Sequence, residues 1–361
     1  MLSTGRGMLR AMKSHRLLIT WIFALVGIAC FVGCRRTATP AETSSEKIAR
    51  LTAACEQGKY VSCFSLGTKY MSGDGVAKDE ARAVALFQRA CDNGEGQGCG
   101  GLAFMYETGR GVAKGLARGI SLYQKACDSG DALGCASLGS MYEGGNGIAK
   151  DVARALALYQ RSCDSGNAGN AMGCGELGRM YFFGNGVTKD TARAVALYQR
   201  ACDGDSAGHC TSLGTLYGTG SGVVKDEEHA VKLYQRACDG DSAEGCYRLG
   251  ISYVTGTGVV KDEAHAAGLF QRGCDGGDVE ACTILGTMYG AGSGVVRDDA
   301  HAMKLLQQGC DGADADGCAA LGIVYETGMG IKKDAARALA LYQRACRMGS
   351  KRACDDARHV H

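Results

Sequence analysis

One 36-residue pattern of apolar and polar positions recurs along most of the chain. The copy at residues 238–273 is regular, and the next copy begins at Cys274. A fixed period between roughly 20 and 50 residues is typical of arrays in which each repeat packs only against its neighbours. The length of 361 residues therefore counts repeats rather than globular domains.

Each copy contains two short stretches with apolar residues at helical spacing. Leu102, Ala103 and Tyr106 illustrate the first stretch, and Ala83 and Phe87 the second. A Gly-x-Gly turn separates the two stretches, and an aspartate usually follows where a helix N-cap belongs. Helices of about a dozen residues cannot bury their apolar faces alone. The pattern therefore predicts an all-α solenoid of stacked helix hairpins.

Eighteen of the 20 cysteines form nine close pairs. Spacing of eight, found in all but one pair, places one cysteine in the last turn of a helix and its partner in the first turn of the next, close enough for a disulfide. Zinc sites want C-x-x-C or His–Cys clusters, which the sequence lacks, and an even thiol count behind an export signal favours disulfides. The predicted bridges are Cys55–Cys63, Cys91–Cys99, Cys127–Cys135, Cys163–Cys174, Cys202–Cys210, Cys238–Cys246, Cys274–Cys282, Cys310–Cys318 and Cys346–Cys354.

The N-terminus has the pattern of an export signal. Basic residues precede an apolar run at residues 17–33, which is short for a membrane span and matches a signal peptide over residues 1–33. The run ends in Phe-Val-Gly-Cys34, which resembles the lipobox of bacterial lipoproteins and implies lipidation of Cys34; Cys30 ends a weaker competing site. An uncleaved anchor helix and plain secretion are the alternatives.

All three possibilities place the array outside the cytoplasm, in the cell envelope. A lipid anchor would hold it at the outer membrane or in the periplasm, and the chain would touch a membrane only through that anchor. The polar residues 34–46 predict a disordered tether between the anchor and the array.

Several kinds of chemistry find no support in the sequence. The 40 lysines and arginines balance 38 acidic residues, so there is no basic surface for nucleic acid. His229, His265 and His301 lie one repeat apart, which would separate them by at least about 8 Å, too far to share a metal ion. Residues 44–47 spell S-x-x-K without the companion motifs of serine β-lactamases. We therefore expect no catalytic residue, cofactor or bound metal.

The order L-G-x-x-Y-x-x-G-x-G-V, K-D and A-x-x-L-Y-Q-R-A-C resembles the Sel-like repeat, a longer relative of the tetratricopeptide repeat. The resemblance implies a right-handed α/α superhelical solenoid of eight repeats over residues 59–349, with a capping helix at 47–58 and a partial repeat at 350–361. The cysteine pair in each unit is similar to the Helicobacter cysteine-rich proteins, which are exported Sel-like arrays with one disulfide per hairpin. That likeness implies an alternative function, binding of β-lactams or peptidoglycan fragments with possible β-lactamase activity, although no catalytic residue carries over.

The positions one, five and eight residues after the second cysteine of each pair, here named the variable row, differ between repeats. In tetratricopeptide-type arrays this row lines the concave groove. Its variation is what a binding groove would show, and tolerated drift would look the same. The main hypothesis is an envelope scaffold, expected to be a monomer, that binds an unknown protein or peptide partner. The candidate groove residues are Phe64, Phe104, Glu107, Arg179, Phe182, Tyr247 and Ile251.

Overall fold

The computed structural model describes residues 43–166 and 170–360, and all regular structure within them is α-helical. The predicted signal peptide, Cys30, Cys34 and the tether up to residue 42 lie outside the described residues. The helices are α2 (Ser44–Glu56), α3 (Tyr60–Ser72), α4 (Glu80–Asp92), α5 (Gly96–Thr108), α6 (Leu116–Asp128), α7 (Ala132–Gly144), α8 (Val152–Asp164), α9 (Asn170–Phe183), α10 (Thr191–Asp203), α11 (Ala207–Thr219), α12 (Glu227–Asp239), α13 (Ala243–Thr255), α14 (Glu263–Asp275), α15 (Val279–Ala291), α16 (Asp299–Asp311), α17 (Ala315–Thr327), α18 (Ala335–Arg347) and α19 (Lys351–His359).

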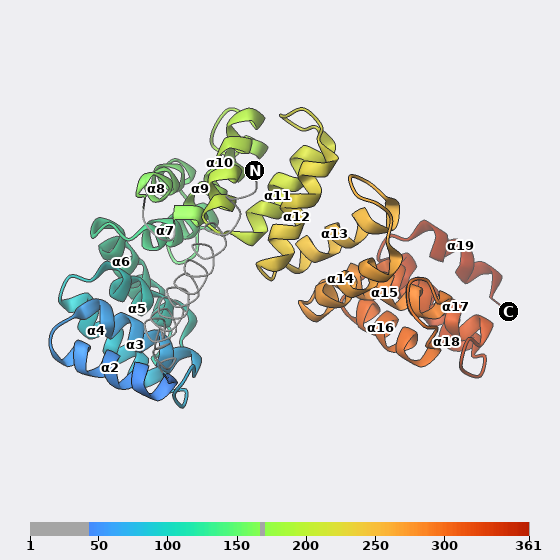
Figure 1. Cartoon of the computed structure of the whole chain (residues 1–361), viewed down its shortest axis with the longest axis horizontal. Coiled ribbons are helices and arrows are strands. Elements are labelled where there is room, and N and C mark those ends of the chain that lie inside the picture. Colours follow the sequence, from blue (N-terminus) through green and yellow to red (C-terminus); the bar gives the residue numbers. More distant parts are fainter. Residues whose placement is uncertain (1–42, 167–169, 361) are drawn as a thin grey trace, which may run out of the picture. The chain divides into compact units, whose positions relative to one another are not determined.

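The odd-numbered helices, here called A helices, alternate with the even-numbered B helices. The chain divides into two units at Arg50, and the stacked hairpins lie in the second, from Leu51 onwards. From α3 to α19, each helix packs against the next one along the chain (Figure 1). Several A helices also contact the following A helix: α3 packs against α5, and α5 packs against α7. The predicted all-α solenoid of helix hairpins is confirmed.

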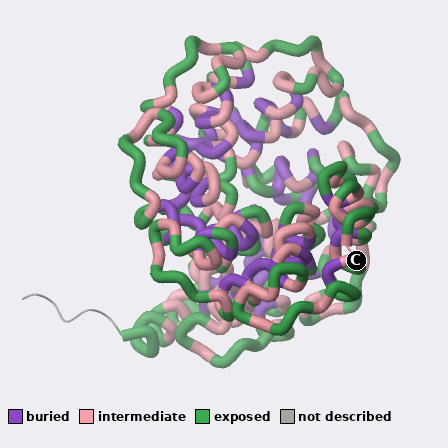
Figure 2. The backbone as a smooth tube through the Cα atoms, turned by 90° about the vertical axis from the view of Figure 1, so that its right-hand side faces the viewer, coloured by how far each residue is buried: buried purple, intermediate pink, exposed green. Residues whose placement is uncertain are grey.

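Buried residues lie on the helix sides that face neighbouring helices, and exposed residues follow the connecting turns (Figure 2). An interior glycine in most A helices permits a close contact with the B helix. A side chain at Gly67 would place its Cβ 2.6 Å from the ring of Phe87, which is fully buried on the B helix of the same repeat. The glycine therefore allows an aromatic ring to sit directly against the A-helix backbone. No helix among the described residues has the length and apolarity needed to cross a membrane.

Glycine and aspartate set the helix ends as the sequence predicts. Gly73 ends α3 with φ 80° and donates its N–H to the carbonyl of Lys69. Asp79 then caps α4 by accepting a hydrogen bond from the N–H of Arg82 at 2.9 Å. The left-handed conformation favours glycine, and a side-chain acceptor satisfies an amide that the helix leaves open.

The first described helix begins three residues before the predicted start of the capping helix at residue 47. The N–H of Thr43 donates to Glu46 Oε2 at 2.8 Å, and the N–H of Glu46 donates to Thr43 Oγ1 at 3.2 Å. This reciprocal pair is a capping box, which stabilises the first turn of a helix. Residues 44–46, assigned from composition to the tether, therefore belong to α2.

The cysteine pairs lie where one hairpin meets the next. All nine pairs named above are at disulfide-bonding distance, with Cα atoms 4.4 to 4.7 Å apart. Each bridge joins the end of a B helix to the start of the next A helix. The solenoid therefore has a covalent staple at every such junction.

A basic side chain adds a second link between successive B helices. Arg161 donates to the carbonyl oxygen of Cys127 at 2.9 Å, and Arg344 donates to that of Cys310 at 2.8 Å. Lys125, Arg200 and Arg272 make the same bond to the preceding repeat. The last carbonyls of a helix lack partners within the helix, so these bonds satisfy them and fix the spacing between repeats.

Candidate binding surface

Two of the candidate groove residues, Phe64 and Phe104, meet in one pocket. Phe64 on α3 and Phe104 on α5 line a cavity of about 560 Å³, together with Met71, Tyr123 and Leu133. The side chains of Phe104 and Leu133 are 36 % and 50 % exposed, so the pocket opens to solvent through apolar residues. A volume of this size suits a small ligand or one to three side chains of a partner.

The pocket exists because two glycines replace larger residues on α5. Gly100 occupies the first position of the variable row, where the preceding repeat has Phe64. Gly101 lies against the ring of Phe87, so a Cβ there would come within 3.1 Å of that ring. The array also shows how such a space closes: at Gly175, the equivalent of Gly100, the imidazole of His209 fills it, 2.0 Å from where a Cβ would lie.

One carboxylate lies in the wall of this pocket. Asp131 precedes α7, and its Oδ2 accepts a hydrogen bond from the N–H of Gly134 at 3.0 Å. Burial raises the pKa of Asp131, and the nearby Glu95 raises it further, while backbone hydrogen bonds oppose the shift. The pocket thus combines aromatic surface with a partly desolvated acid.

Glu107 does not line the pocket, but it contacts Tyr123, which does, and its role is structural. Its Oε2 accepts a hydrogen bond from the hydroxyl of Tyr123 at 2.7 Å. Burial, together with this bond, raises the pKa of Tyr123. The same Tyr–Glu pairing recurs in two other repeats, at Tyr159–Glu143 and Tyr342–Glu326. Glu107 therefore ties the A helix of its repeat to the B helix.

Arg179 is held by two glutamates. Its guanidinium pairs with Glu143 of the preceding repeat and with Glu176 on its own helix, the latter at 2.7 Å. Burial acts to raise the pKa of Glu143, but hydrogen bonds from Arg179, Tyr159 and Asn185 lower it overall. This arginine is engaged in linking repeats, which leaves it poorly suited to hold a ligand carboxylate.

The remaining candidates pack in two other places. Phe182 contacts Phe183 edge-on, with ring centroids 4.9 Å apart. The ring centroid of Tyr247 lies 6.1 Å from that of Phe270, and Ile251 packs into the same core cluster. Of the candidate groove residues, the structure therefore brings only Phe64 and Phe104 together in the pocket.

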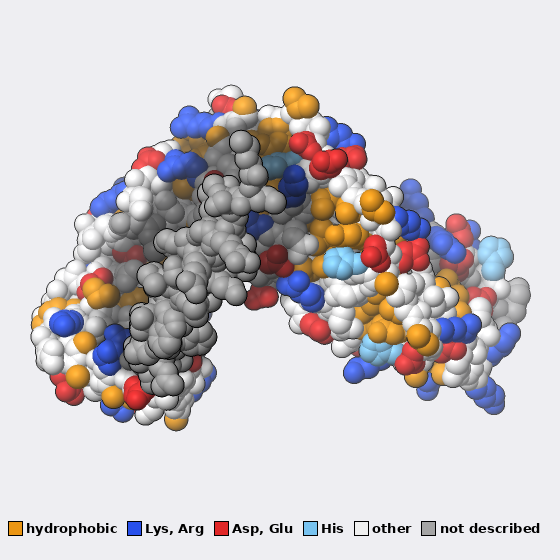
Figure 3. Space-filling view, viewed as in Figure 1, with side chains coloured by type: hydrophobic (Ala, Val, Ile, Leu, Met, Phe, Trp, Pro, Cys, Tyr) orange, Lys and Arg blue, Asp and Glu red, His pale blue; other side chains and the backbone are white. Residues whose placement is uncertain are grey.

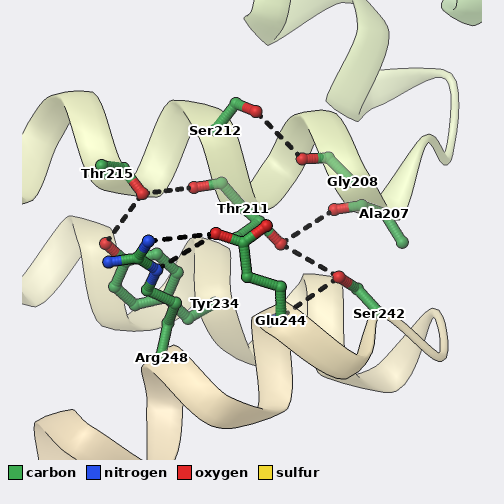
Figure 4. Close-up of polar contacts among 10 residues, drawn as sticks. Ala207, Gly208, Thr211, Ser212, Thr215, Tyr234, Ser242, Glu244 and Arg248 are labelled. Atoms are coloured by element: carbon green, nitrogen blue, oxygen red, sulfur yellow. Dashed lines mark hydrogen bonds and ion pairs between the residues drawn. The ribbon is translucent and has the colours of Figure 1, made fainter. Parts of the chain in front are cut away.

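Hydroxyl groups replace aromatic residues of the row on α11 (Figure 4). Thr211 donates to the carbonyl of Ala207 at 3.3 Å and lies 3.2 Å from the hydroxyl of Ser242. Thr215 accepts a hydrogen bond from the hydroxyl of Tyr234 at 3.4 Å. These bonds join α11, α12 and the start of α13, so this part of the row is a polar inter-helix contact.

Arg248, on α13, is also paired with an acid. Its Nη2 lies 3.1 Å from Glu244 Oε1 one turn earlier on α13 (Figure 4). Neither arginine supports the β-lactam hypothesis, because each already has an acidic partner.

The three histidines of the sequence pattern pack on tyrosines. The rings of His229, His265 and His301 lie 4.4 to 4.5 Å from those of Tyr217, Tyr253 and Tyr289. In other repeats an arginine takes this position, as Arg82 does over Tyr70 at 4.5 Å. Histidine and arginine therefore pack in equivalent ways on the tyrosine of each repeat. Histidines and hydrophobic side chains lie side by side over α13–α16 (Figure 3).

A depression of similar construction recurs beside the turns that join A helices to B helices. One, with a volume of about 800 Å³, is lined by Tyr70, Lys78, Asp79 and Arg82. Equivalent residues line two others, at Tyr181 and at Tyr325. These depressions are open to solvent, and equivalent residues of three repeats line them. The pocket at Phe104 is lined differently, by aromatic and aliphatic residues of several helices.

A serine–histidine contact escaped the sequence analysis. Ser206 Oγ lies 2.6 Å from His209 Nδ1, three residues later in the first turn of α11. Burial lowers the pKa of His209, whose ring packs between Gly175 and Tyr198. At the start of α13, the equivalent serine hydroxyl, Ser242 Oγ, accepts a hydrogen bond from the backbone N–H of Gly245. At the start of α11, the hydroxyl of Ser206 bonds the imidazole of His209 instead. The contact is therefore accounted for as a helix cap, and the signal for it was the spacing Ser-x-x-His.

Comparison with known proteins agrees with this architecture. The Sel1 repeat family matches eight segments, residues 61–95, 97–131, 132–167, 171–206, 210–242, 243–278, 279–314 and 315–350. The comparison with curated proteins gave no match.

Two solved structures, from Escherichia coli and Oxalobacter formigenes, show the same fold. A protective antigen of uropathogenic Escherichia coli with an SLR fold is 26 % identical, with a TM-score of 0.65, over 86 % of this chain and 66 % of its own. The chain thus spans about two thirds of that antigen's length. A Sel1 repeat protein from Oxalobacter formigenes is 26 % identical, with a TM-score of 0.55, over 63 % of this chain and 99 % of its own. Cysteine rich protein B of Helicobacter pylori is 30 % identical over 38 % of this chain and 96 % of its own, with a TM-score of 0.30. With its repeats matched in sequence and in fold, the chain belongs to the Sel1 repeat proteins.

Proposed function

We propose that the protein is an exported scaffold that binds a protein or peptide partner, with the pocket at Phe104 as its anchor point. Sel1 repeat proteins generally bind protein partners. The observation that carries the proposal is the pocket itself, in which partly exposed aromatic and aliphatic residues surround a cavity of about 560 Å³. Aromatic residues that become buried at the centre of an interface contribute much of the binding energy in many protein complexes.

The cysteines support export. Disulfides form and persist in oxidising compartments and are rare in the cytosol. Nine pairs at bonding distance therefore favour a protein that works outside the cytoplasm. Attachment through a lipid at Cys34 is part of the same proposal.

A capture experiment with a matched control tests the anchor. The purified full-length protein, the double variant Phe104→Ala/Leu133→Ala and the control Phe183→Ala are each incubated with envelope extract from the native cells. Phe183 is 68 % exposed and does not line the pocket. Its replacement therefore removes exposed aromatic surface without changing the pocket. Quantitative mass spectrometry then measures the captured proteins.

We expect a partner that wild type and control capture equally and that the double variant loses by at least about 10-fold, because truncating a central aromatic residue commonly costs more than about 1.4 kcal/mol. Equal capture by all three proteins would place the binding surface away from this pocket.

A further inference from the structure

We propose that the pocket takes a peptide segment in which a lysine or arginine adjoins an apolar side chain. This inference rests on the proposed function and names the chemistry of the partner. The rings of Phe64, Phe104 and Tyr123 line the pocket and would contact the apolar side chain of the peptide. The carboxylate of Asp131 lies in the same wall and would pair with the basic side chain.

Asp131 has acceptor capacity to spare. One of its oxygens, Oδ2, accepts the N–H of Gly134 at 3.0 Å, and this same oxygen lies 2.8 Å from where a Cβ at Gly100 would sit. Among the described residues Asp131 makes no ion pair. A carboxylate has about four lone-pair positions, so backbone bonds from Gly134 and Leu133 leave room for a ligand donor.

The charges around Asp131 reinforce the preference for a cation. Glu95, at the start of α5, is half-buried and lies near enough to raise the pKa of Asp131. The cation nearest the aromatic wall already has a partner. The guanidinium of Arg110 lies 5.8 Å from the centre of the Phe104 ring and pairs with Glu80 at 2.8 Å. Asp131 itself makes no ion pair within residues 43–166 and 170–360, so a ligand cation in the pocket would meet an acid that the described part of the chain does not neutralise.

Burial makes this arrangement costly without a ligand. A partly desolvated carboxylate loses hydration, and a second acid beside it adds repulsion. A lysine or arginine head group would offset both, while its aliphatic stem and its apolar neighbour covered the aromatic rings. At Gly100 the carboxylate of Asp131 lies where a Cβ would sit, whereas at the equivalent Gly175 the imidazole of His209 lies there, so only the first of the two positions presents an acid to a head group.

The test uses a random twelve-residue peptide library displayed on phage. The library is selected in parallel against the oxidised full-length protein and against Asp131→Asn. Asparagine is as good an N-cap as aspartate, so the variant keeps the bond to Gly134 and removes only the charge. Circular dichroism confirms that the helix content of the two proteins is the same.

We expect wild type to enrich peptides that pair Lys or Arg with an aromatic or aliphatic residue, and Asp131→Asn to enrich apolar peptides without the basic residue. A synthetic basic peptide from the selection should bind Asp131→Asn about 10-fold more weakly, as should its Lys→norleucine analogue to wild type, because hydrogen bonds to charged groups contribute about that much. The two changes together should cost little more than either alone.

Two results would overturn the inference, and they differ in what they say of the proposed function. If the selected peptides need Phe104 but bind Asp131→Asn unchanged, the anchor stands and the preference for a cation is wrong. If no selected peptide loses affinity in Phe104→Ala, the anchor itself is wrong.

Discussion

At the scale of single residues, small side chains decide what the array can do. In most A helices an interior glycine admits a side chain from the B helix, usually an aromatic ring, as Gly250 admits Phe270. The sequence predicted this close approach, because an interior glycine that recurs in most repeats needs a packing reason. It did not predict the pocket, because Gly100 and Gly175 occupy equivalent positions and differ only in their neighbours, the carboxylate of Asp131 in the pocket wall at Gly100 and the imidazole of His209 at Gly175.

Alanine substitution at two glycines of one hairpin separates packing from helix propensity. A Cβ at Gly250 would lie 2.7 Å from the ring of Phe270, whereas a Cβ at the exposed Gly268 meets nothing within 4 Å. Overpacking a core costs about 1 to 3 kcal/mol, while Gly→Ala in an open helix position gains up to about 1 kcal/mol. Gly250→Ala should therefore lower the urea midpoint of unfolding, and Gly268→Ala should raise it. Equal midpoints for the two variants would contradict the packing role of the A-helix glycine.

At the scale of helices, periodicity was enough to find the elements. Apolar residues at helical spacing, glycine turns and aspartate caps together fixed every hairpin from α3 onwards. The start of α2 was misplaced because Thr43 and Glu46 lie in a segment whose composition favours a tether, and a capping box is a local signal that composition hides. Contacts between repeats, such as Arg161 with Cys127, could not be predicted from a single unit.

The Cys274–Cys282 disulfide differs from the disulfides on either side of it through such a contact. Gln308 occupies the position of the arginines that bond the preceding repeat, and Cys274 is half-buried, whereas Cys238 and Cys310 are fully buried. A reducing thiolate must reach a sulfur atom to exchange with it. Limited treatment with dithiothreitol should therefore open Cys274–Cys282 before Cys238–Cys246, as measured by alkylation and peptide mass spectrometry.

The replacement Gln308→Arg supplies the control for this prediction. An arginine at that position should cover Cys274 as Arg272 covers Cys238, where it donates to the carbonyl oxygen at 2.6 Å. The reduction rate of Cys274–Cys282 should then fall toward that of Cys238–Cys246. If the arginine left the rate unchanged, exposure at Gln308 would not be the cause.

At the scale of the whole molecule, the sequence predicted the architecture more fully than the ligand. In a repeat array the same sequence pattern occurs many times, so each of the eight copies strengthens the prediction of helix hairpins made from the others. A binding site depends on the departures from that pattern, and one sequence does not show which departures lie together in space. Phe64 and Phe104 share a pocket, whereas Phe182 and Tyr247 pack separately, although all four occupy the variable row.

The attachment of the molecule to the cell is a prediction of the sequence that metabolic labelling can test. The apolar run at residues 17–33 ends at Cys34, and every cysteine from Cys55 onwards has a partner at bonding distance, so the array itself offers no free thiol for a lipid. Cells fed a radiolabelled fatty acid should label the wild-type protein and Cys30→Ser, and should leave Cys34→Ser unlabelled. Label lost in Cys30→Ser but kept in Cys34→Ser would move the anchor to Cys30. A wild-type protein without label would favour plain secretion or an uncleaved anchor helix, and extraction of the membranes at alkaline pH would separate these two, because a single spanning helix stays with the lipid whereas a secreted array does not.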